Sequence, residues 1–486
     1  MKREMFSSKW GIILAGLGMA VGTGNIWRFP RVVSQNGGGA FIIPWLLFLF
    51  IWSIPLLIIE FSIGRSYKTG VITSFGKLIG KKYTWMGAFV AFVTIAIMFY
   101  YSVVTGWCIK YFFATIFQNL IHKDSQKFWL SFTGSGEPVF FHFMAILIGS
   151  LIIYLGVVKG IERANRIMIP SLFVLLVIAC IRALTLKGAL NGLNFLFYPD
   201  ISKLGDYKIW LNALSQSAWS TGAGWGLILT YAIYSREKET PVHTSVTLGL
   251  GNNTASILAG MAIIPTVFAF FSGPDFSFSK VIKVMEAGNQ GLTFIWLPHL
   301  FTKVPGGTFF LSLFFLTLTF AAFSSLISMI ELGTRIFIDA GFTRKKSVLI
   351  IGTMGFLFGL PSALSMGFFN NQDWVWGLGL MVSGFFFTLG VIKYGVKSFR
   401  ENFINSVEDK FKLGRWFDFL VLILLPLEFL AMISWWFWQS YSQSPGDWLK
   451  IFSPYTVGTV VFQLILAIVI FISLNKLITK KFMIKE

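Results

Sequence analysis

The chain has 486 residues, of which 55% are hydrophobic, 17% are aromatic and 13% are charged, and its mean hydropathy is +0.72. Soluble globular proteins carry about 25% charged residues, so this composition excludes a disordered chain, a secreted disulfide scaffold and a typical cytosolic enzyme. The formal net charge of +19 would suggest nucleic-acid binding in a soluble chain, but here the basic residues lie between apolar runs. Cys108 and Cys180 lie inside such runs and match no metal or redox spacing, so we expect them to pack in the core.

Apolar segments without Asp, Glu, Lys or Arg recur along the whole chain. A helix needs about 20 mainly apolar residues to cross a bilayer. We interpret these segments as twelve membrane spans of an all-α integral membrane protein: 10–27, 32–59, 84–109, 139–158, 167–181, 209–235, 244–274, 304–330, 347–372, 374–392, 429–446 and 451–475. Arg28 and a glycine-rich segment follow the first span instead of a cleavage site, which argues against a signal peptide.

The distribution of basic residues predicts the orientation in the membrane. Twelve spans place both termini on one side, and cytoplasmic loops are enriched in Lys and Arg. Placing the N-terminus inside puts most of the basic residues there, including Lys81, Lys82, Lys345 and Lys346. We therefore expect a multi-pass protein of the cell membrane with both termini cytoplasmic, and no nucleic-acid partner.

Glycines interrupt two of the predicted spans. The first span contains LAGLGMAVGTGNIWRFP, and the sixth contains SAWSTGAGWGLILTY, with Gly-x-Gly steps that begin at Gly22 and Gly222. Each glycine weakens a helix interior by about 1 kcal/mol relative to alanine. Paired interruptions predict a transporter with inverted repeats and a midplane site lined by unwound backbone. Close helix packing through small residues is the alternative.

Motifs around these interruptions resemble one known family. GNIWRFP at 24–30, followed by NGGGAF at 36–41, resembles the signature of the neurotransmitter:sodium symporter family. The similarity continues through YYSVVTGW, NNTAS, LPHLFTKVPGGTFF and FAAFSSLISMIE, and it covers about the first ten spans. It implies a 5+5 inverted repeat with discontinuous helices 1 and 6. The implied divisions are a cytoplasmic N-terminus (1–9), a first repeat (10–184), a second repeat (185–397), and spans 11 and 12 with a cytoplasmic C-terminus (398–486).

The resemblance also implies two bound sodium ions. The first site maps to Ala20, Asn25, Ser220 and Asn252, and the substrate carboxylate completes it. The second site maps to the carbonyl groups of Gly18, Val21 and Ala321 and the hydroxyl groups of Ser324 and Ser325. From the residues alone, the two serines could instead bond to carbonyl groups of their own helix.

The resemblance extends to a chloride ion. Chloride-dependent members place a serine four residues after the span 7 asparagine, where this chain has Ser256. The implied chloride residues are Trp45, Gln216, Ser220, Asn252 and Ser256. The family has a tyrosine at the position of Trp45, and an indole N–H reaches differently from a phenol, which leaves chloride dependence open.

The expected substrate follows from the absence of an acid in span 1. Amine-transporting members carry an aspartate in this break, whereas this chain has Gly22. The substrate must then bring its own carboxylate to the positive helix end, which describes an α-amino acid. The implied substrate residues are Met19, Ala20, Thr23, Gly24, Ile97, Tyr101, Trp219, Ser220, Gly222, Trp225, Ser325 and Met329. These walls carry no charge, so a neutral and hydrophobic side chain is expected.

Two charge pairs match the gates of the family. Arg28 and Asp373 would close the outer side above Tyr101 and Trp219, and Arg3 and Asp339 would close the inner side. The alternative for the outer pair is two separately solvated charges. The remaining intramembrane acids are interpreted as hydrogen-bonded contacts between helices and not as a proton relay: Glu60, Glu331 and Glu428.

The sequence therefore predicts a sodium-coupled, chloride-dependent symporter that imports a neutral amino acid by alternating access. Four scattered histidines and the lack of a phosphate-binding loop argue against an enzyme. A proton-coupled amino-acid permease and a non-transporting amino-acid sensor on the same fold remain the alternatives. The expected partners are the small-molecule substrate and the lipid bilayer.

Overall fold

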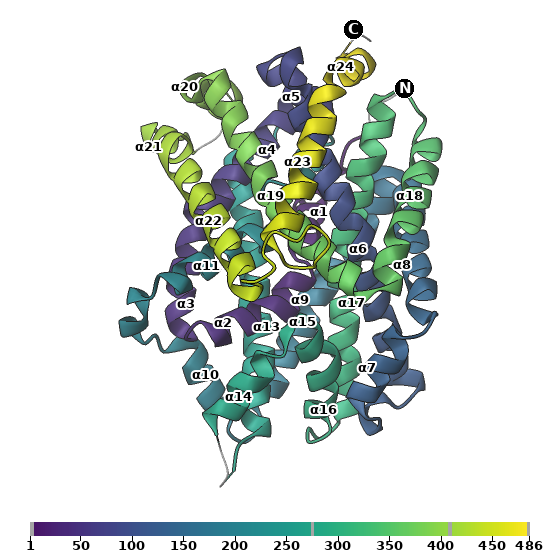
Figure 1. Cartoon of the computed structure of the whole chain (residues 1–486), viewed down its shortest axis with the longest axis vertical. Coiled ribbons are helices and arrows are strands. Elements are labelled where there is room, and N and C mark those ends of the chain that lie inside the picture. Colours follow the sequence, from purple (N-terminus) through teal and green to yellow (C-terminus); the bar gives the residue numbers. More distant parts are fainter. Residues whose placement is uncertain (1–3, 274–276, 407–410, 484–486) are drawn as a thin grey trace.

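The computed structural model describes residues 4–273, 277–406 and 411–483. These residues are mostly helical, and within them the only extended pairing is an isolated bridge between Gly38 and Pro199. Long helices run roughly along the vertical axis of Figure 1, and both chain ends are marked at the end that carries α5, α20 and α24. The predicted all-α membrane architecture is confirmed.

The elements fall into two halves of the chain, where α marks helices and η marks short π or 3-10 segments. The first half contains α1 (Lys9–Ala20), η1 (Gly24–Arg28), α2 (Phe29–Gln35), α3 (Gly39–Phe48), η2 (Leu49–Ser53), α4 (Ile54–Tyr67), α5 (Val71–Ile79), η3 (Lys81–Tyr83), α6 (Thr84–Phe117), η4 (Leu120–His122), α7 (Ser125–Thr133), α8 (Glu137–Tyr154), η5 (Val157–Glu162), α9 (Arg163–Leu184), α10 (Ala189–Phe197) and η6 (Ile201–Gly205). The second half contains α11 (Tyr207–Ser220), α12 (Leu227–Ala232), α13 (Pro241–Phe270), α14 (Phe278–Met285), α15 (Gly288–Gln290), η7 (Gly291–Trp296), α16 (Leu297–Phe301), α17 (Gly307–Asp339), α18 (Arg344–Leu364), α19 (Met366–Tyr394), α20 (Val396–Phe399), η8 (Arg400–Ile404), α21 (Arg415–Phe419), η9 (Leu420–Leu424), α22 (Leu425–Gln443), α23 (Val457–Ser473) and α24 (Asn475–Met483).

Polar side chains set the starts of several helices. Ser8 accepts a hydrogen bond from the Gly11 N–H at the start of α1, and Asp206, Thr343 and Ser365 do the same for α11, α18 and α19. These caps satisfy N–H groups that the first helical turn leaves without a partner. The capped helices can therefore begin at defined residues at the edge of the apolar layer.

The number of spans can be compared with the twelve that the sequence predicts. Within the described residues, nine helices are long and apolar enough to cross a membrane, and two bent helix pairs raise this number to eleven. The predicted span at 209–235 is outside this set because residues 221–226 divide it into α11 and α12, neither of which is long enough alone. Twelve spans and the division into repeats stay predictions.

Both predicted helix interruptions are present. The first span is divided between α1 and η1, with a bend of 53°, and Val21 adopts an extended backbone at the break. The second break contains Gly222, Gly224 and Gly226, all at positive φ, which favours glycine. At Gly224 a Cβ would lie 2.7 Å from the Cα of Gly384 in α19, so a side chain would also collide with a neighbouring helix.

Candidate functional site

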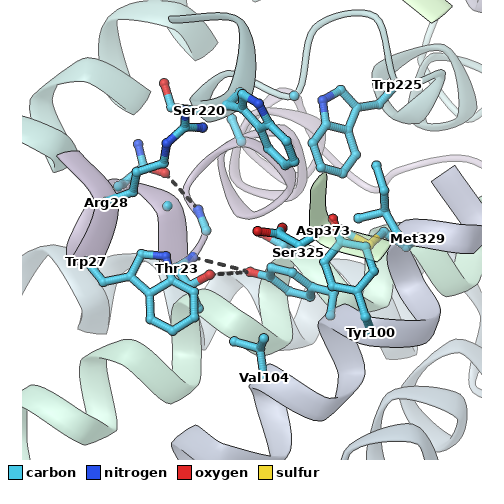
Figure 2. Close-up of a pocket in the computed structure, with 18 of the residues that line it drawn as sticks. Thr23, Trp27, Arg28, Tyr100, Val104, Ser220, Trp225, Ser325, Met329 and Asp373 are labelled. Atoms are coloured by element: carbon cyan, nitrogen blue, oxygen red, sulfur yellow. Dashed lines mark hydrogen bonds between the residues drawn. The ribbon is translucent and has the colours of Figure 1, made fainter. Parts of the chain in front are cut away.

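A cavity of about 210 Å³ lies where the two helix breaks meet. Its walls come from both breaks and from α6, α17 and α19 (Figure 2). All twelve residues predicted to contact substrate line this cavity. The sequence analysis missed further lining residues, among them Tyr100, Val104, Phe369 and Trp436. Their aromatic and apolar side chains resemble ordinary core residues, so the sequence carries no signal that separates them from the core.

The break in the first span is held open by a tyrosine from α6. The Thr23 N–H and hydroxyl both donate to the hydroxyl oxygen of Tyr101, at 3.2 and 3.3 Å (Figure 2). A Cβ on Gly22 would lie 2.8 Å from the Ser325 Oγ and 3.1 Å from the Tyr101 hydroxyl. An acidic side chain at residue 22 would therefore have to displace both hydroxyl groups.

Several oxygens converge beside the first break. Asn25 Oδ1 accepts from the Gly22 N–H at 3.0 Å, which fixes the orientation of the Asn25 amide. The Asn25 Nδ2 then donates to Asn252 Oδ1 at 2.8 Å, which fixes the Asn252 amide in turn. In this orientation Asn252 Oδ1 lies 3.1 Å from the carbonyl oxygen of Ala20 and 2.8 Å from that of Ser220. Turning the Asn252 amide would place its N–H₂ against that of Asn25, so Asn252 Oδ1 faces two carbonyl oxygens, an arrangement that a cation among them would stabilise.

A second group of oxygens joins α1 to α17. The Ser324 hydroxyl lies 3.4 Å from the Val21 carbonyl oxygen and 3.0 Å from that of Ala321. The Ser325 hydroxyl reaches the carbonyl oxygens of Gly18 and Met19, both at 3.3 Å. Ser324 therefore bonds partly within its own helix, as the alternative interpretation expects, whereas Ser325 bonds across to the other helix. All five residues assigned to the second sodium site lie together.

The predicted chloride residues include hydrogen-bond donors that lack acceptors. Trp45 Nε1 and both amide atoms of Gln216 are buried and have no partner among the described residues. Leaving a buried donor unsatisfied costs about 1–3 kcal/mol. Ser256, also fully buried, accepts from Asn25 Nδ2 at 2.8 Å, so this serine adjoins the first oxygen cluster. Donors of this kind suit an anion.

Comparisons with known proteins agree with this geometry. The family model described as the sodium:neurotransmitter symporter family matches residues 3–136 and 130–483. The chain belongs to the sodium:neurotransmitter symporter family. It is therefore a sodium-dependent symporter of the membrane and not an enzyme.

Relatives and solved structures cover most of this symporter. It is 31% identical over 456 residues to an uncharacterized sodium-dependent transporter of Methanocaldococcus jannaschii. The aligned region covers 89% of the symporter and 90% of the relative. A sodium- and chloride-dependent taurine transporter of Rattus norvegicus is 26% identical over 488 residues. That alignment covers 87% of the symporter and 76% of the taurine transporter. The crystal structure of MhsT in complex with L-phenylalanine matches with a TM-score of 0.75 and 30% identity, over 89% of the symporter and 99% of that chain.

The two residues of the predicted outer gate line the cavity without an ion pair between them. Within the described residues no ion pair of 4.0 Å or less joins Arg28 to Asp373, although both line the same cavity. The Arg28 guanidinium donates to the Ser215 hydroxyl at 3.2 Å and lies 5.3 Å from the ring centre of Trp219. The predicted Arg28–Asp373 pair is thus not formed in this conformation. Pairing in a closed state stays a prediction.

The predicted inner gate pair stays a prediction, because only one of its two residues is described. Arg3 lies outside the described residues, and Asp339 pairs with Arg335 of its own helix at 2.7 Å. Arg344 bridges Glu331, at 2.7 Å, and Glu4 of the N-terminal segment, at 3.0 Å. The sequence contained one indication of this network: Glu331 is predicted to be an intramembrane acid, and charges inside membrane spans are usually paired.

The three remaining intramembrane acids differ in their partners. Glu60 accepts a hydrogen bond from the Gly224 N–H in the second break, and Glu331 pairs with Arg344, so both connect elements as predicted. The prediction for Glu428 is wrong, because neither of its carboxyl oxygens has a hydrogen-bond partner among the described residues. Its helix packs through aromatic contacts instead, with Phe429 stacked on Phe385 at 4.0 Å.

Proposed function

We propose that the symporter imports a neutral, hydrophobic α-amino acid by alternating access, driven by two sodium ions and accompanied by chloride. The observation that carries this proposal is the cavity between the two helix breaks. Backbone groups of both breaks adjoin it, the two oxygen clusters lie beside it, and apolar side chains form much of its wall. This is the arrangement expected of a midplane transport site built from discontinuous helices.

The charges around the cavity indicate the class of substrate. Apart from Arg28, Arg31 and Asp373, the described residues that line the cavity carry no charge. An unpaired charge on the substrate side chain would cost several kcal/mol to bury, so a neutral side chain is favoured. The position of Gly22 beside two hydroxyl groups leaves no place for an acid that would hold an amine substrate.

Two features support a bulky apolar side chain. Trp219 and Trp225 meet edge to face with ring centres 6.1 Å apart, and Met19, Ile97 and Met329 also line the cavity. The crystal structure of the relative MhsT is a complex with L-phenylalanine, an amino acid whose side chain is bulky and apolar. The substrate carboxylate would lie near Thr23 and Gly24, where the start of η1 is positive, and a Cβ on Gly24 would meet open space.

The ion sites follow from the oxygen clusters and the unpaired donors. Sodium would lie among the Ala20, Ser220 and Asn252 oxygens, with Asn25 and the substrate carboxylate beside it. A second sodium would lie between the carbonyl groups of Gly18, Val21 and Ala321 and the two serine hydroxyls. Both are all-oxygen sites, as hard cations prefer. Chloride would accept hydrogen bonds from Trp45, Gln216 and Ser256, beside Ser220 and Asn252.

Uptake by purified symporter in liposomes tests the proposal. An inward sodium gradient is expected to drive accumulation of radiolabelled L-phenylalanine and L-leucine, and neither taurine nor γ-aminobutyrate should compete. A potassium gradient of equal size is the control. Uptake driven by a pH gradient without sodium would favour the proton-coupled permease. Sodium-dependent binding without uptake under any gradient would favour a sensor, and both results would contradict the proposal.

A further inference from the structure

A second, larger cavity shares Tyr100 with the transport site. It is an apolar groove of about 540 Å³ between α5, α6, α17, α18, α19, α23 and α24. Tyr100 lines both the groove and the transport cavity. The groove wall is mostly aromatic and aliphatic, with Phe92, Ile95, Phe99, Phe358, Trp376 and Phe471 among its residues.

The groove lies along membrane-spanning helices and has the length of a lipid chain. On α6 its lining extends from Ala88 to Tyr100, which corresponds to about 18 Å of helix. One leaflet of a bilayer is about 15 Å of hydrocarbon, half of the total core. Phe358 of α18 is 57% exposed, so this wall faces the surroundings of the protein. At this depth those surroundings are lipid tails, and a tail is the occupant whose length and polarity match.

Basic residues gather where the groove ends at α24. Ile478 and Phe482 of α24 line the groove, and α24 is bent by 58° from α23. Asn475 and Thr479 of α24 donate to the Lys81 carbonyl oxygen, at 3.3 and 3.0 Å, and thereby bring α24 beside η3. The two segments together carry five exposed lysines: Lys81, Lys82, Lys476, Lys480 and Lys481.

This lysine cluster has the charge that an anionic headgroup requires. Figure 1 places α24 at the same end of the molecule as both chain termini. Lysines close to a membrane surface attract anionic lipids by an amount that corresponds to about fivefold in affinity for each residue. A lipid whose tail fills the groove would carry its phosphate to the level of η3 and α24, because the groove ends there.

We propose that this groove binds one acyl chain of an anionic phospholipid from the leaflet on the side of the termini, with the lipid phosphate held by the lysines of η3 and α24. The site is separate from the transport site, and it does not depend on which amino acid the symporter carries. Zwitterionic lipids fit the apolar groove equally well but offer no net charge to the lysines. Selectivity for anionic headgroups is therefore the distinguishing property of the site.

Photo-crosslinking locates the lipid directly. The full-length symporter is reconstituted in phosphatidylcholine liposomes that contain a small amount of phosphatidylglycerol with a diazirine in its acyl chain. After irradiation, peptide mapping by mass spectrometry is expected to find adducts on groove residues such as Phe92 and Phe471. Labelling there should exceed that by the matching phosphatidylcholine probe by about fivefold or more. The double variant Lys480→Gln/Lys481→Gln should reduce this preference by about fivefold or more, whereas Lys397→Gln/Lys412→Gln, two exposed lysines elsewhere, should keep it unchanged.

A groove-filling variant provides an independent check. Ala91 lines the groove, so the larger side chain of Ala91→Trp should occupy part of it and remove the groove adducts with either probe. Leu151→Trp, on an exposed part of α8, is the control. Equal labelling by the two probes, or groove labelling no greater than that around Leu151, would overturn the proposal. Adducts that instead join two copies of the symporter through the groove would show a protein partner and also overturn it.

Discussion

Replacing Asn252 with alanine removes one of the three oxygens that converge beside the first helix break, and we expect it to weaken sodium binding selectively. Asn252 Oδ1 lies 3.1 and 2.8 Å from the carbonyl oxygens of Ala20 and Ser220, where a sodium ion would lie. An interaction between a polar group and a charge contributes about 1.5–3 kcal/mol. The sodium concentration for half-maximal substrate binding should therefore rise roughly 10- to 150-fold.

The fold should tolerate this substitution, which separates an ion-binding effect from misfolding. Without the Asn252 side chain, Asn25 Nδ2 still donates to Ser256 Oγ at 2.8 Å and to the Asn252 carbonyl oxygen at 3.2 Å. The matched control is Asn253→Ala, which removes a neighbouring amide whose Oδ1 accepts only from the Nδ2 of Asn252. We expect it to change the sodium requirement by much less.

Scintillation proximity binding of tritiated L-phenylalanine at varied sodium concentration measures the effect, with osmotic balance kept by choline. Circular dichroism and size-exclusion chromatography establish that both variants are folded. Equal sodium requirements for Asn252→Ala and the unmodified symporter would refute the assignment of this oxygen cluster. Substrate binding that needs no sodium in the unmodified symporter would refute the role of both clusters.

Three further predictions concern chloride, the outer gate and the charge that moves. Ser256→Glu should bind substrate equally well in chloride and in gluconate, because a fixed carboxylate replaces the anion's charge; if the unmodified symporter already ignores chloride, the Trp45 substitution has removed the site. Asp373→Asn should retain a binding signal but reduce liposome uptake, since Arg28 then lacks its partner in the closed state, and unchanged uptake would contradict this role. Two sodium ions, one chloride and a zwitterionic substrate carry one net positive charge inward in each transport cycle. That charge gains about 2.3 kcal/mol per 100 mV, so an inside-negative potential of about 100 mV should raise substrate accumulation up to about fortyfold. Uptake at potentials set by potassium and valinomycin measures this effect, and accumulation that ignores the potential would contradict the proposed stoichiometry.

The transport site could be placed from the sequence because its residues are local to recognisable breaks. Glycine steps weaken a helix, and the motifs around Gly22 and Gly222 distinguish these two from the Gly-x-Gly step at Gly249 and Gly251, which lies within the continuous helix α13. The resemblance then extended the site to α6 and α17. For this reason all twelve predicted substrate residues line one cavity.

Features that depend on tertiary packing could not be predicted in this way. Whether Arg28 meets Asp373 depends on the conformation of the whole protein, and nothing in the sequence indicates that Glu428 has no hydrogen-bond partner among the described residues. The groove beside Tyr100 is formed by helices that are distant in the chain, and its residues have the composition of any lipid-facing surface. Sequence periodicity does not distinguish a groove from a filled interface.

The amide of Asn25 has a consequence for how the two kinds of ion influence each other. Its Nδ2 donates both to Asn252, in the proposed sodium cluster, and to Ser256, in the proposed chloride group, at 2.8 Å in each case. With both ions bound as proposed, a cation would lie on one side of this amide and an anion on the other. Binding of either ion would then favour the other through a shared coupling free energy. Thermodynamic linkage makes this effect reciprocal: the factor by which chloride raises the affinity for sodium must equal the factor by which sodium raises the affinity for chloride.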